Sequence, residues 1–330
     1  MASTELSAGL GPTIRPSAGQ PDAQPGSPPS RAREAAIKTG QALLRLFRAL
    51  RSNRKASTGF ILLAFVCVLA AVPGLIAHDP PRLEIYGRSL GPSARHLFGT
   101  TVYGQDIFAQ FIWGARETLI IAVVSGVLST TLSVVMGVAA AYLGGVADGG
   151  LNLVTDTLLV IPSFPLLLII AAYLPNSGVI VLIAILVITG YSYGARQLRA
   201  QALSLRSRDY LEAARVRGER STYIIAVEMI PAMTPLIVAT FLGTAVYNVL
   251  FAAGLQFIGF GNPASVSWGT MLYWAQNNEA LSIGQYLWAL MPGLGIAILG
   301  ASFALLNYAF DEIGNPALRP VRRLRVKRAR

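Results

Sequence analysis

Residues 118–143 read TLIIAVVSGVLSTTLSVVMGVAAAYL, a stretch without a charged side chain. An α-helix needs about 20 mostly apolar residues to cross the hydrocarbon core of a bilayer, because each residue adds only ~1.5 Å to its length. The stretch meets that length. We therefore expect residues 118–143 to form a membrane-spanning helix.

Five further apolar segments lie along the chain, at residues 59–77, 151–174, 178–194, 233–260 and 287–310. Only 13% of the residues are charged, whereas soluble domains carry about 25%. The segments do not alternate polar and apolar residues as membrane β-strands do. The sequence therefore predicts an all-α, polytopic membrane protein with a bundle of six transmembrane helices.

The positive charges are distributed unevenly around the predicted spans. Of the 27 Lys and Arg residues, nine precede span one, seven lie between spans four and five, seven lie in the C-terminal tail, and four lie between spans one and two. Loops rich in Lys and Arg stay in the cytoplasm. We therefore expect both termini and the loop 195–232 to be cytoplasmic. The net charge of +11 fits contact with anionic membrane lipid, so a nucleic-acid partner is not needed.

The two ends of the chain differ from the spans. Residues 1–56 are predicted to form a cytoplasmic tail, and residues 1–30 of it are rich in Pro, Gly, Ser and Ala, a composition typical of disorder. Apolar residues share one helical face over 36–52, which predicts a helix lying in the membrane interface or one packed on protein. Residues 57–310 hold the six spans, and residues 311–330 form a basic cytoplasmic tail.

Sequence patterns of enzymes and metal sites do not fit this chain. Residues 190–194 match the G-x-S-x-G pattern of serine hydrolases, but they lie at the cytoplasmic end of a predicted span, and His78 and His96 lie on the other side of the membrane. The single cysteine, Cys67, excludes a cysteine-rich metal site. We therefore predict no catalytic residues and no metal site.

The three lysines are Lys38, Lys55 and Lys327, and none of them follows a glycine. A phosphate-binding loop of the Walker A type requires a lysine in that position. If transport is driven by ATP, then ATP and Mg must bind to partner subunits, and this chain binds no cofactor itself.

The segment from Asp209 to Gly218, DYLEAARVRG, lies in the predicted cytoplasmic loop. The pattern predicts a helix from about Ser207, a break at Gly218, and a short second helix from Ser221, its N-cap, to about Met229. An exposed helical finger of this kind suits insertion into a cytoplasmic partner. The residues expected to make that contact are Tyr210, Glu212, Ala213, Ala214, Arg217, Gly218 and Ser221.

This loop resembles the EAA loop of the permease subunits of ABC importers. The spacing fits from Glu212 through Gly218 to Ile230-Pro231, although Glu228 stands where an apolar residue is usual. The resemblance implies that the loop docks in a groove of an ATPase subunit and transmits its closure to the spans.

Other segments resemble a narrower family, the C-type permease subunits of dipeptide, oligopeptide and nickel importers. The resemblance implies a second related permease subunit, two ATPase subunits and an extracytoplasmic binding protein, in the inner membrane of a bacterium. It also implies delivery of substrate to residues 78–116 and 261–286. The segments that carry it, over about residues 57–320, include HLFGT at 96–100, GAR at 114–116, PSFP at 162–165, YGAR at 193–196, GLQFIGFG at 254–261, SWGTML at 267–272 and NPALR at 315–319.

Some positions depart from the family pattern, and these leave the substrate open. Thr101 and Gln105 replace an acid and a base, Ala252 a glutamate, and Gln256 a serine. Peptides and oligosaccharides are both retained, with a nickel importer or an ion-coupled secondary transporter as alternatives. Four aromatic residues are predicted to stack on sugar rings or to form an interfacial belt; they are Tyr273, Trp274, Tyr286 and Trp288.

Polar residues inside the spans are predicted either to line a pathway or to hold helices together. Tyr247, Asn248 and Gln256 lie in span five. Asp156 lies in span three, near its cytoplasmic end, where we expect it to cap a helix or to pair with an arginine of the 195–220 segment.

Overall fold

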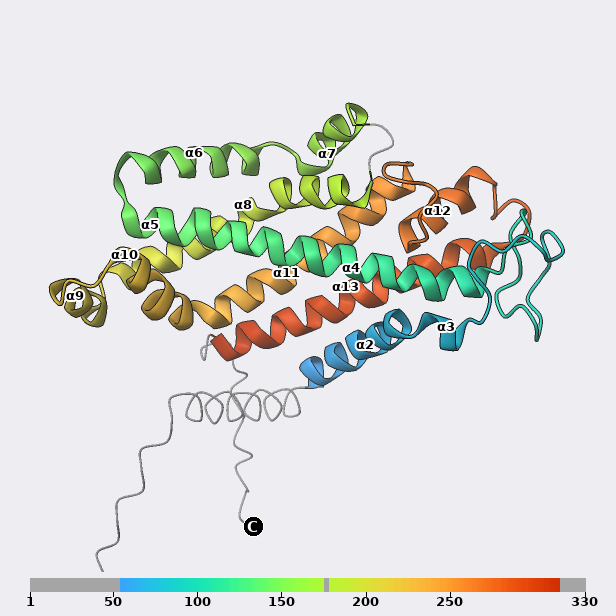
Figure 1. Ribbon diagram of the computed structural model, residues 1–330, viewed down its shortest axis with the longest axis horizontal. Helices are drawn as coiled ribbons and strands as arrows, with labels where there is room; N and C mark the ends of the chain where they lie inside the picture. Colours follow the sequence, from blue (N-terminus) through green and yellow to red (C-terminus); the bar gives the residue numbers. More distant parts are fainter. Residues whose placement is uncertain (1–53, 175–177, 315–330) are drawn as a thin grey trace, which may run out of the picture. The chain divides into compact units, whose positions relative to one another are not determined.

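The computed structural model describes residues 54–174 and 178–314 (Figure 1). Apolar character and length allow five of the helices in these ranges to cross a membrane, and a bent pair can form a sixth span. The expectation of an all-α bundle is confirmed. The helices are α2 (Arg54–Ala71), α3 (Pro73–Ile76), α4 (Ile107–Val134), α5 (Ala140–Leu143), α6 (Gly145–Val160), α7 (Ser163–Ala172), α8 (Val179–Arg206), α9 (Asp209–Val216), α10 (Ser221–Tyr223), α11 (Ile230–Phe257), α12 (Trp268–Asn277) and α13 (Tyr286–Gly314).

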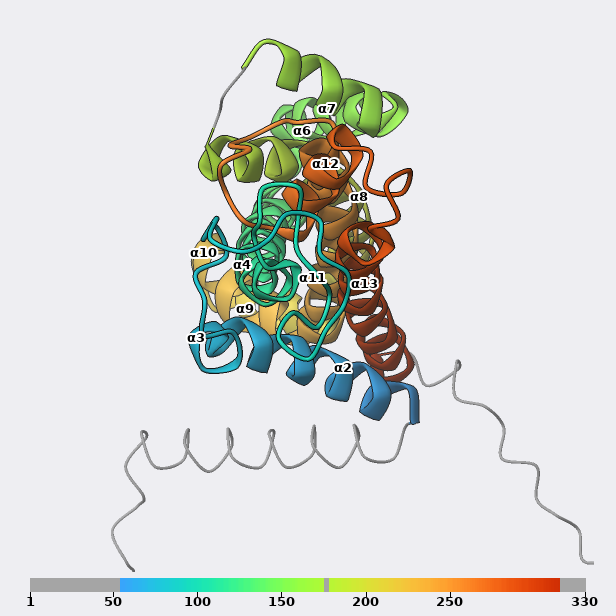
Figure 2. The ribbon, with the colours of Figure 1, turned by 90° about the vertical axis from the view of Figure 1, so that its right-hand side faces the viewer.

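Helix α11 lies at the centre of the bundle and packs against α4, α8 and α13. Helix α2 packs on α13 and α4, whereas α6 and α7 pack on α8, so these elements lie on opposite sides of the bundle (Figures 1 and 2). Small residues bring the central helices close together. A Cβ atom at Gly194 of α8 would lie 2.6 Å from Thr240 of α11 and 2.8 Å from Ser133 of α4. Membrane helices use small residues in this way, because close backbone approach increases their packing contacts.

The predicted third span, over residues 151–174, is sharply bent in the structure. Helices α6 and α7 are bent by 93° relative to each other. Pro162 lies between them and is preceded by Ile161 in an extended conformation. A proline ring disfavours helical geometry in the residue before it, so the helix ends there. The bent pair α6–α7 therefore stands where a single third span was expected.

The other predicted boundaries differ because the helices continue beyond the apolar segments. Helix α4 begins at Ile107 and continues through a π-helical turn, Val135–Ala139, into α5, so that 107–143 form one helix. Helix α8 continues through the first part of the predicted loop to Arg206. Residues 221–257 also form one continuous helix through the π-helical residues 224–229. The prediction of a short second helix that ends at about Met229 is therefore wrong.

Three of the segments named in the sequence analysis lie outside the described ranges. The predicted disordered tail, the helix over 36–52 and the motif at 315–319 all lie there, at least in part. Helix α13 continues to Gly314, so the predicted tail at 311–330 begins within a helix.

Candidate functional site

Helix α9 and the turn after it form a finger at one end of the bundle (Figure 1). Gly218 has a φ of +79°, and a Cβ atom there would meet nothing within 4 Å. Its amide donates to the carbonyl of Arg215 at 2.9 Å, and that of Glu219 to the carbonyl of Ala214 at 3.2 Å. These bonds close the helix in the way usual for a glycine at a helix C-terminus. The predicted break at Gly218 is confirmed, and the helix begins at Asp209 rather than at Ser207.

The two faces of α9 have different surroundings. Leu211 and Ala214 are both 0% exposed and pack in an apolar cluster with Ile224 and Met229. Ala214 therefore lets α9 approach its own bundle, and the expectation that it faces a partner is wrong. The outer face is uncovered and partly apolar, and its exposed residues are Tyr210, Glu212, Ala213, Val216, Arg217 and Gly218.

Ser221 does not cap a helix as predicted. Arg220 occupies the N-cap position with an extended backbone. Ser221 is the first residue of the helix, and no side chain makes a capping hydrogen bond there. Ser221 is nevertheless exposed beside the turn that contains Gly218. It therefore remains on the outer surface of the finger.

Arg215 joins the finger to helix α5, and the sequence analysis did not single it out. Its guanidinium lies 5.2 Å from the ring centroid of Tyr142, and its Nε donates to the Tyr142 hydroxyl at 3.4 Å. A further nitrogen donates to the carbonyl of Arg206 at 3.1 Å. Its position four residues after the apolar Leu211, on the same face of the helix, was the available signal. Arg215 thus connects α9, α5 and the end of α8.

The start of α6 is held to α8 by an ion pair. The guanidinium of Arg199 donates two hydrogen bonds to the carboxylate of Asp148, at 2.9 and 2.8 Å. Among the described residues, Asp156 instead accepts a hydrogen bond from Asn152 within its own helix, at 2.8 Å. Neither predicted role of Asp156, capping a helix or pairing with an arginine, is therefore seen among the described residues, and Asp148, in the first turn of α6, is the carboxylate that reaches α8.

Asn248 and Gln256 act as hydrogen-bonding partners between segments. Asn248 is fully buried and donates from Nδ2 to Ser125 of α4 at 2.8 Å. The side-chain oxygen of Gln256 accepts a hydrogen bond from Ser267 at 2.9 Å. The structural interpretation fits both residues, since buried polar groups in a bundle need partners.

Tyr247 stacks on Phe251, with a centroid separation of 3.9 Å, and lines a polar cavity of about 440 Å³ between α6, α7, α8, α11 and α13. Ser192 of the G-x-S-x-G pattern lines it too. Neither histidine does, and His96 instead pairs with Asp106 at 2.6 Å. The polar lining makes this cavity the candidate pathway surface within the bundle; its members include Ser163, Thr189, Ser192, Tyr193, Gln197, Thr240, Thr244, Tyr247, Asn307 and Asp311.

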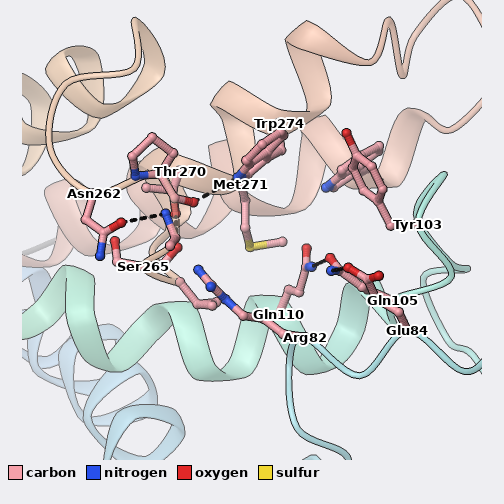
Figure 3. Close-up of a pocket in the computed structure, with 14 residues that line it drawn as sticks. Arg82, Glu84, Tyr103, Gln105, Gln110, Asn262, Ser265, Thr270, Met271 and Trp274 are labelled. Carbon is pink, nitrogen blue, oxygen red and sulfur yellow. Dashed lines mark hydrogen bonds between the residues drawn. The ribbon is translucent and has the colours of Figure 1, made fainter. Parts of the chain in front are cut away.

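A second cavity, of about 480 Å³, lies near α12, at the opposite end of the bundle from α9 in Figure 1, and Figure 3 shows its lining residues. Its walls come from the segment before α4, the start of α4, the loop before α12, α12 itself and the first turn of α13. Met271 and Trp274 provide an apolar wall, and the Trp274 indole donates to the carbonyl of Pro263 at 2.9 Å. Arg82 and Glu84 also line the cavity.

The segment before α4 is held by polar contacts. Asp106 caps α4 by accepting from the Ala109 amide at 2.9 Å. The ring of Tyr86 packs edge-on against His96, with centroids 4.4 Å apart. Its hydroxyl donates to Asp79 at 2.6 Å, and this hydrogen bond raises the pKa of the Tyr86 phenol. The segment that forms one wall of the cavity is therefore held in place by several internal hydrogen bonds and by a ring contact.

The family model described as the inner membrane component of binding-protein-dependent transport systems matches residues 129–318. This chain belongs to that family. The match includes the finger, both halves of the broken span and α11. The resemblance to permease subunits of ABC importers is thereby confirmed, and the chain is an integral inner-membrane permease.

Relatives of this permease cover most of its length. The oligopeptide transport system permease protein OppC of Mycobacterium bovis is 30% identical over 271 residues, which are 81% of this chain and 91% of the relative. The dipeptide transport system permease protein DppC of Bacillus subtilis is 28% identical over 276 residues, 83% and 85% of the two chains. DppC of Alkalihalophilus pseudofirmus is 29% identical over 300 residues, 90% and 96% of the two chains.

Within the permease, the predicted site residues fall into two groups. Those of the finger lie together at one end of the bundle. The polar residues of the spans are separated. Tyr247 lines the cavity of about 440 Å³, Gln256 lies at the other end of α11 near α12, and Asp156 lies on α6. Trp288 is only 1% exposed, so it cannot offer its ring face to a sugar.

Proposed function

We propose that this permease is one of two related transmembrane subunits of an ABC importer that carries oligopeptides. The finger is the observation that carries the ATP-driven part of the proposal, because it presents an uncovered face at the end of an integral membrane bundle. The peptide part is supported by the names of the relatives, OppC and DppC. Oligosaccharides and a nickel complex are the substrates that the test must separate from peptides.

Two ATPase subunits are proposed as the partners that dock on the fingers of the two permeases. Val216 is 84% exposed and Tyr210 42% exposed on the outer face of α9. Exposed apolar side chains grouped beside charged ones are typical of an interaction surface. In this proposal ATP and Mg bind in the ATPases, and this chain supplies no catalytic group and binds no cofactor.

The same proposal places both termini and the finger in the cytoplasm, and α12 outside. The arginines support this, since α9, the turn after it and the last turns of α8 carry six of them, and positive charge favours the cytoplasmic side. A binding protein outside the membrane then delivers substrate to residues 78–116 and 261–286. A cysteine at Ser221 is expected to react with an impermeant thiol reagent only in opened membranes, and one at Ser265 in intact cells. The reverse pattern would contradict this orientation.

Transmission from the finger follows from its contacts with the bundle. When an ATPase moves α9, Leu211 and Ala214 push on the cluster that includes Met229 and Met233, at the base of α11. Arg215 at the same time pulls on Tyr142. A partner shifts an equilibrium only through different contacts with its two states, so the two ATPase states must hold α9 differently.

Uptake by the assembled importer in proteoliposomes tests the proposal. With binding protein outside and Mg-ATP inside, we expect accumulation of a labelled oligopeptide that unlabelled peptide competes with. Maltooligosaccharide and a nickel chelate are not expected to compete. Uptake driven by an ion gradient without ATP would instead support a secondary transporter, and competition by the sugar or the nickel chelate would reassign the substrate.

A further inference from the structure

The cavity near α12 is lined by one positively charged and one negatively charged side chain, which do not pair with each other. Arg82 and Glu84 both line it. Within residues 54–174 and 178–314, Arg82 makes no hydrogen bond or ion pair, and Glu84 is bonded to an amide rather than to a cation. Figure 3 shows Arg82 reaching toward Ser265, while Glu84 lies with Gln105 on the other side of Gln110. The cavity therefore has a positive side and a negative side.

A row of two amides fixes the negative side. Gln110 donates to the side-chain oxygen of Gln105 at 2.6 Å, and Gln105 donates from Nε2 to Glu84 at 2.7 Å. Since the Gln105 oxygen already accepts, its nitrogen must face Glu84, and Glu84 must act as an acceptor. One carboxylate oxygen of Glu84 is thus held in place, and the other is left to accept from a ligand. This also gives a role to Gln105, which departs from the family pattern.

Apolar and unsatisfied groups complete the cavity between the two charges. Met271 lies between Arg82 and Trp274 in Figure 3. Trp288 lines the same cavity, is buried, and has no hydrogen-bond partner for its Nε1 among the described residues. A volume of about 480 Å³ is within the range of small-molecule sites.

We propose that this cavity binds a short zwitterionic peptide, with the ligand carboxylate at Arg82, its ammonium group at Glu84 and an apolar side chain against Met271 and Trp274. Arg82 and Glu84 lie on opposite sides of Gln110 in Figure 3, so the two charges of the ligand must be separated, as those at the two ends of a short peptide are. The permease would then recognise the peptide itself. This proposal rests on the proposed peptide transport and on the α12 end facing outside.

Binding of labelled L-alanyl-L-phenylalanine to the assembled importer, without binding protein, tests the site. Nanodiscs of phosphatidylglycerol alone keep out a zwitterionic lipid headgroup as a competing occupant. We expect saturable binding. The amide of the dipeptide, which lacks the carboxylate, and the N-acetyl dipeptide, which lacks the ammonium group, are each expected to bind about tenfold more weakly, since each loses one charge-assisted hydrogen bond.

Two variants test which side chain binds the carboxylate of the dipeptide and which binds its ammonium group. Arg82→Gln is expected to weaken dipeptide binding about tenfold and to abolish discrimination against the amide, while discrimination against the N-acetyl form remains. Glu84→Gln is expected to show the opposite pattern. Arg88→Gln and Glu279→Gln, at exposed positions outside the cavity lining, are the matched controls and should bind normally.

Three outcomes would overturn the proposal. They are the absence of binding, equal binding of the blocked peptides, and variants that bind normally. If Arg82→Gln weakens capture of the binding protein but not of the dipeptide, the cavity belongs to a protein interface and the proposal is wrong. Uptake of the dipeptide with binding protein and Mg-ATP, measured in parallel, separates this failure from failure of the proposed function, because uptake without direct binding contradicts only the cavity.

Discussion

The finger and the α12 end of the bundle are held in different ways. The finger contacts its bundle through Leu211 and Ala214 and through the side chain of Arg215. At the α12 end, Trp268 is fully buried, stacks on Phe111 at 5.5 Å, and donates from its indole to the Phe111 carbonyl at 2.9 Å. Its amide also donates to the Thr118 hydroxyl at 3.0 Å. Multiple hydrogen bonds around a buried aromatic ring resist displacement, whereas a short helix resting on two apolar side chains can move with a partner.

Additional polar contacts tie the α12 end together. Ser267 and Thr270 form a reciprocal capping box at the start of α12. Tyr103 packs edge-on against Trp274 and donates to Asn278 at 3.1 Å. This contrast predicts that substitutions at the α12 end chiefly lower stability and that substitutions at the finger chiefly lower coupling.

Among the substitutions proposed here, Trp268→Ala is expected to lower the stability of the permease most. Removing a fully buried tryptophan leaves a cavity, which costs about 3–5 kcal/mol, and it removes the indole hydrogen bond to the Phe111 carbonyl. Thermal unfolding of the purified permease in detergent measures the loss. Trp113→Ala, at a tryptophan that is only partly buried, is the control and should lose less. Equal losses would mean that the α12 end is not specially anchored.

Gly218→Val, in the turn after α9, and Gly284→Val, in the loop after α12, form a matched pair. Both glycines have φ near +80°, and in both cases a Cβ atom would meet nothing within 4 Å. Strain should therefore cost each variant a similar amount, of order 1–3 kcal/mol. Only Gly218→Val is expected to weaken ATPase capture and stop ATP-driven uptake, since only Gly218 shapes the finger.

ATPase capture and uptake in proteoliposomes, measured beside thermal unfolding, compare the pair. Normal capture and normal uptake by Gly218→Val would remove the main support for the finger as coupling element. Glu212→Lys, which reverses an exposed charge on α9 without changing the backbone, tests the same surface independently and should also loosen the ATPase.

Arg215→Gln is expected to have the smallest effect on stability. An exposed cation over an aromatic ring contributes about 0.5–1 kcal/mol, and Arg215 is exposed. Its effect on function should be larger, with ATPase docking kept and transport per ATP hydrolysed reduced. Tyr142→Phe keeps the ring, loses only the hydroxyl, and should behave nearly as the wild type. A variant Arg215→Gln that transports with normal stoichiometry would show that Leu211 and Ala214 suffice for transmission.

The sequence predicted the spans because hydrocarbon thickness imposes a length that composition reveals, but it did not predict where the helices end. Helix α8 continues to Arg206 because charged residues can extend a helix beyond the membrane. The break at Pro162 was present in the sequence, since an apolar segment with a central proline invites a bend. Its angle depends on how α6 and α7 pack on α8, and that is set by tertiary contacts.

The candidate sites show the same division. Local pattern was enough for Gly218, because a positive φ between two helices is a property of a few neighbouring residues. The pairing of Arg199 with Asp148 joins positions that are distant in the sequence, and one sequence gives no means of choosing Asp148 over Asp156. The cavity of Arg82 and Glu84 was missed for the same reason, since its walls come from two loops and three helices.

The helix formed by residues 107–143 reaches both ends of the bundle. Its first turns carry Gln110, which lines the cavity of Arg82 and Glu84, and its last turn carries Tyr142, which receives Arg215. At ~1.5 Å per residue its 37 residues span about 55 Å. A tilt of this helix around a point near its middle would therefore move both of its ends. A tilt of about 5° around its midpoint moves each end by roughly 2 Å in opposite directions, which is comparable with the difference between making and breaking a hydrogen bond.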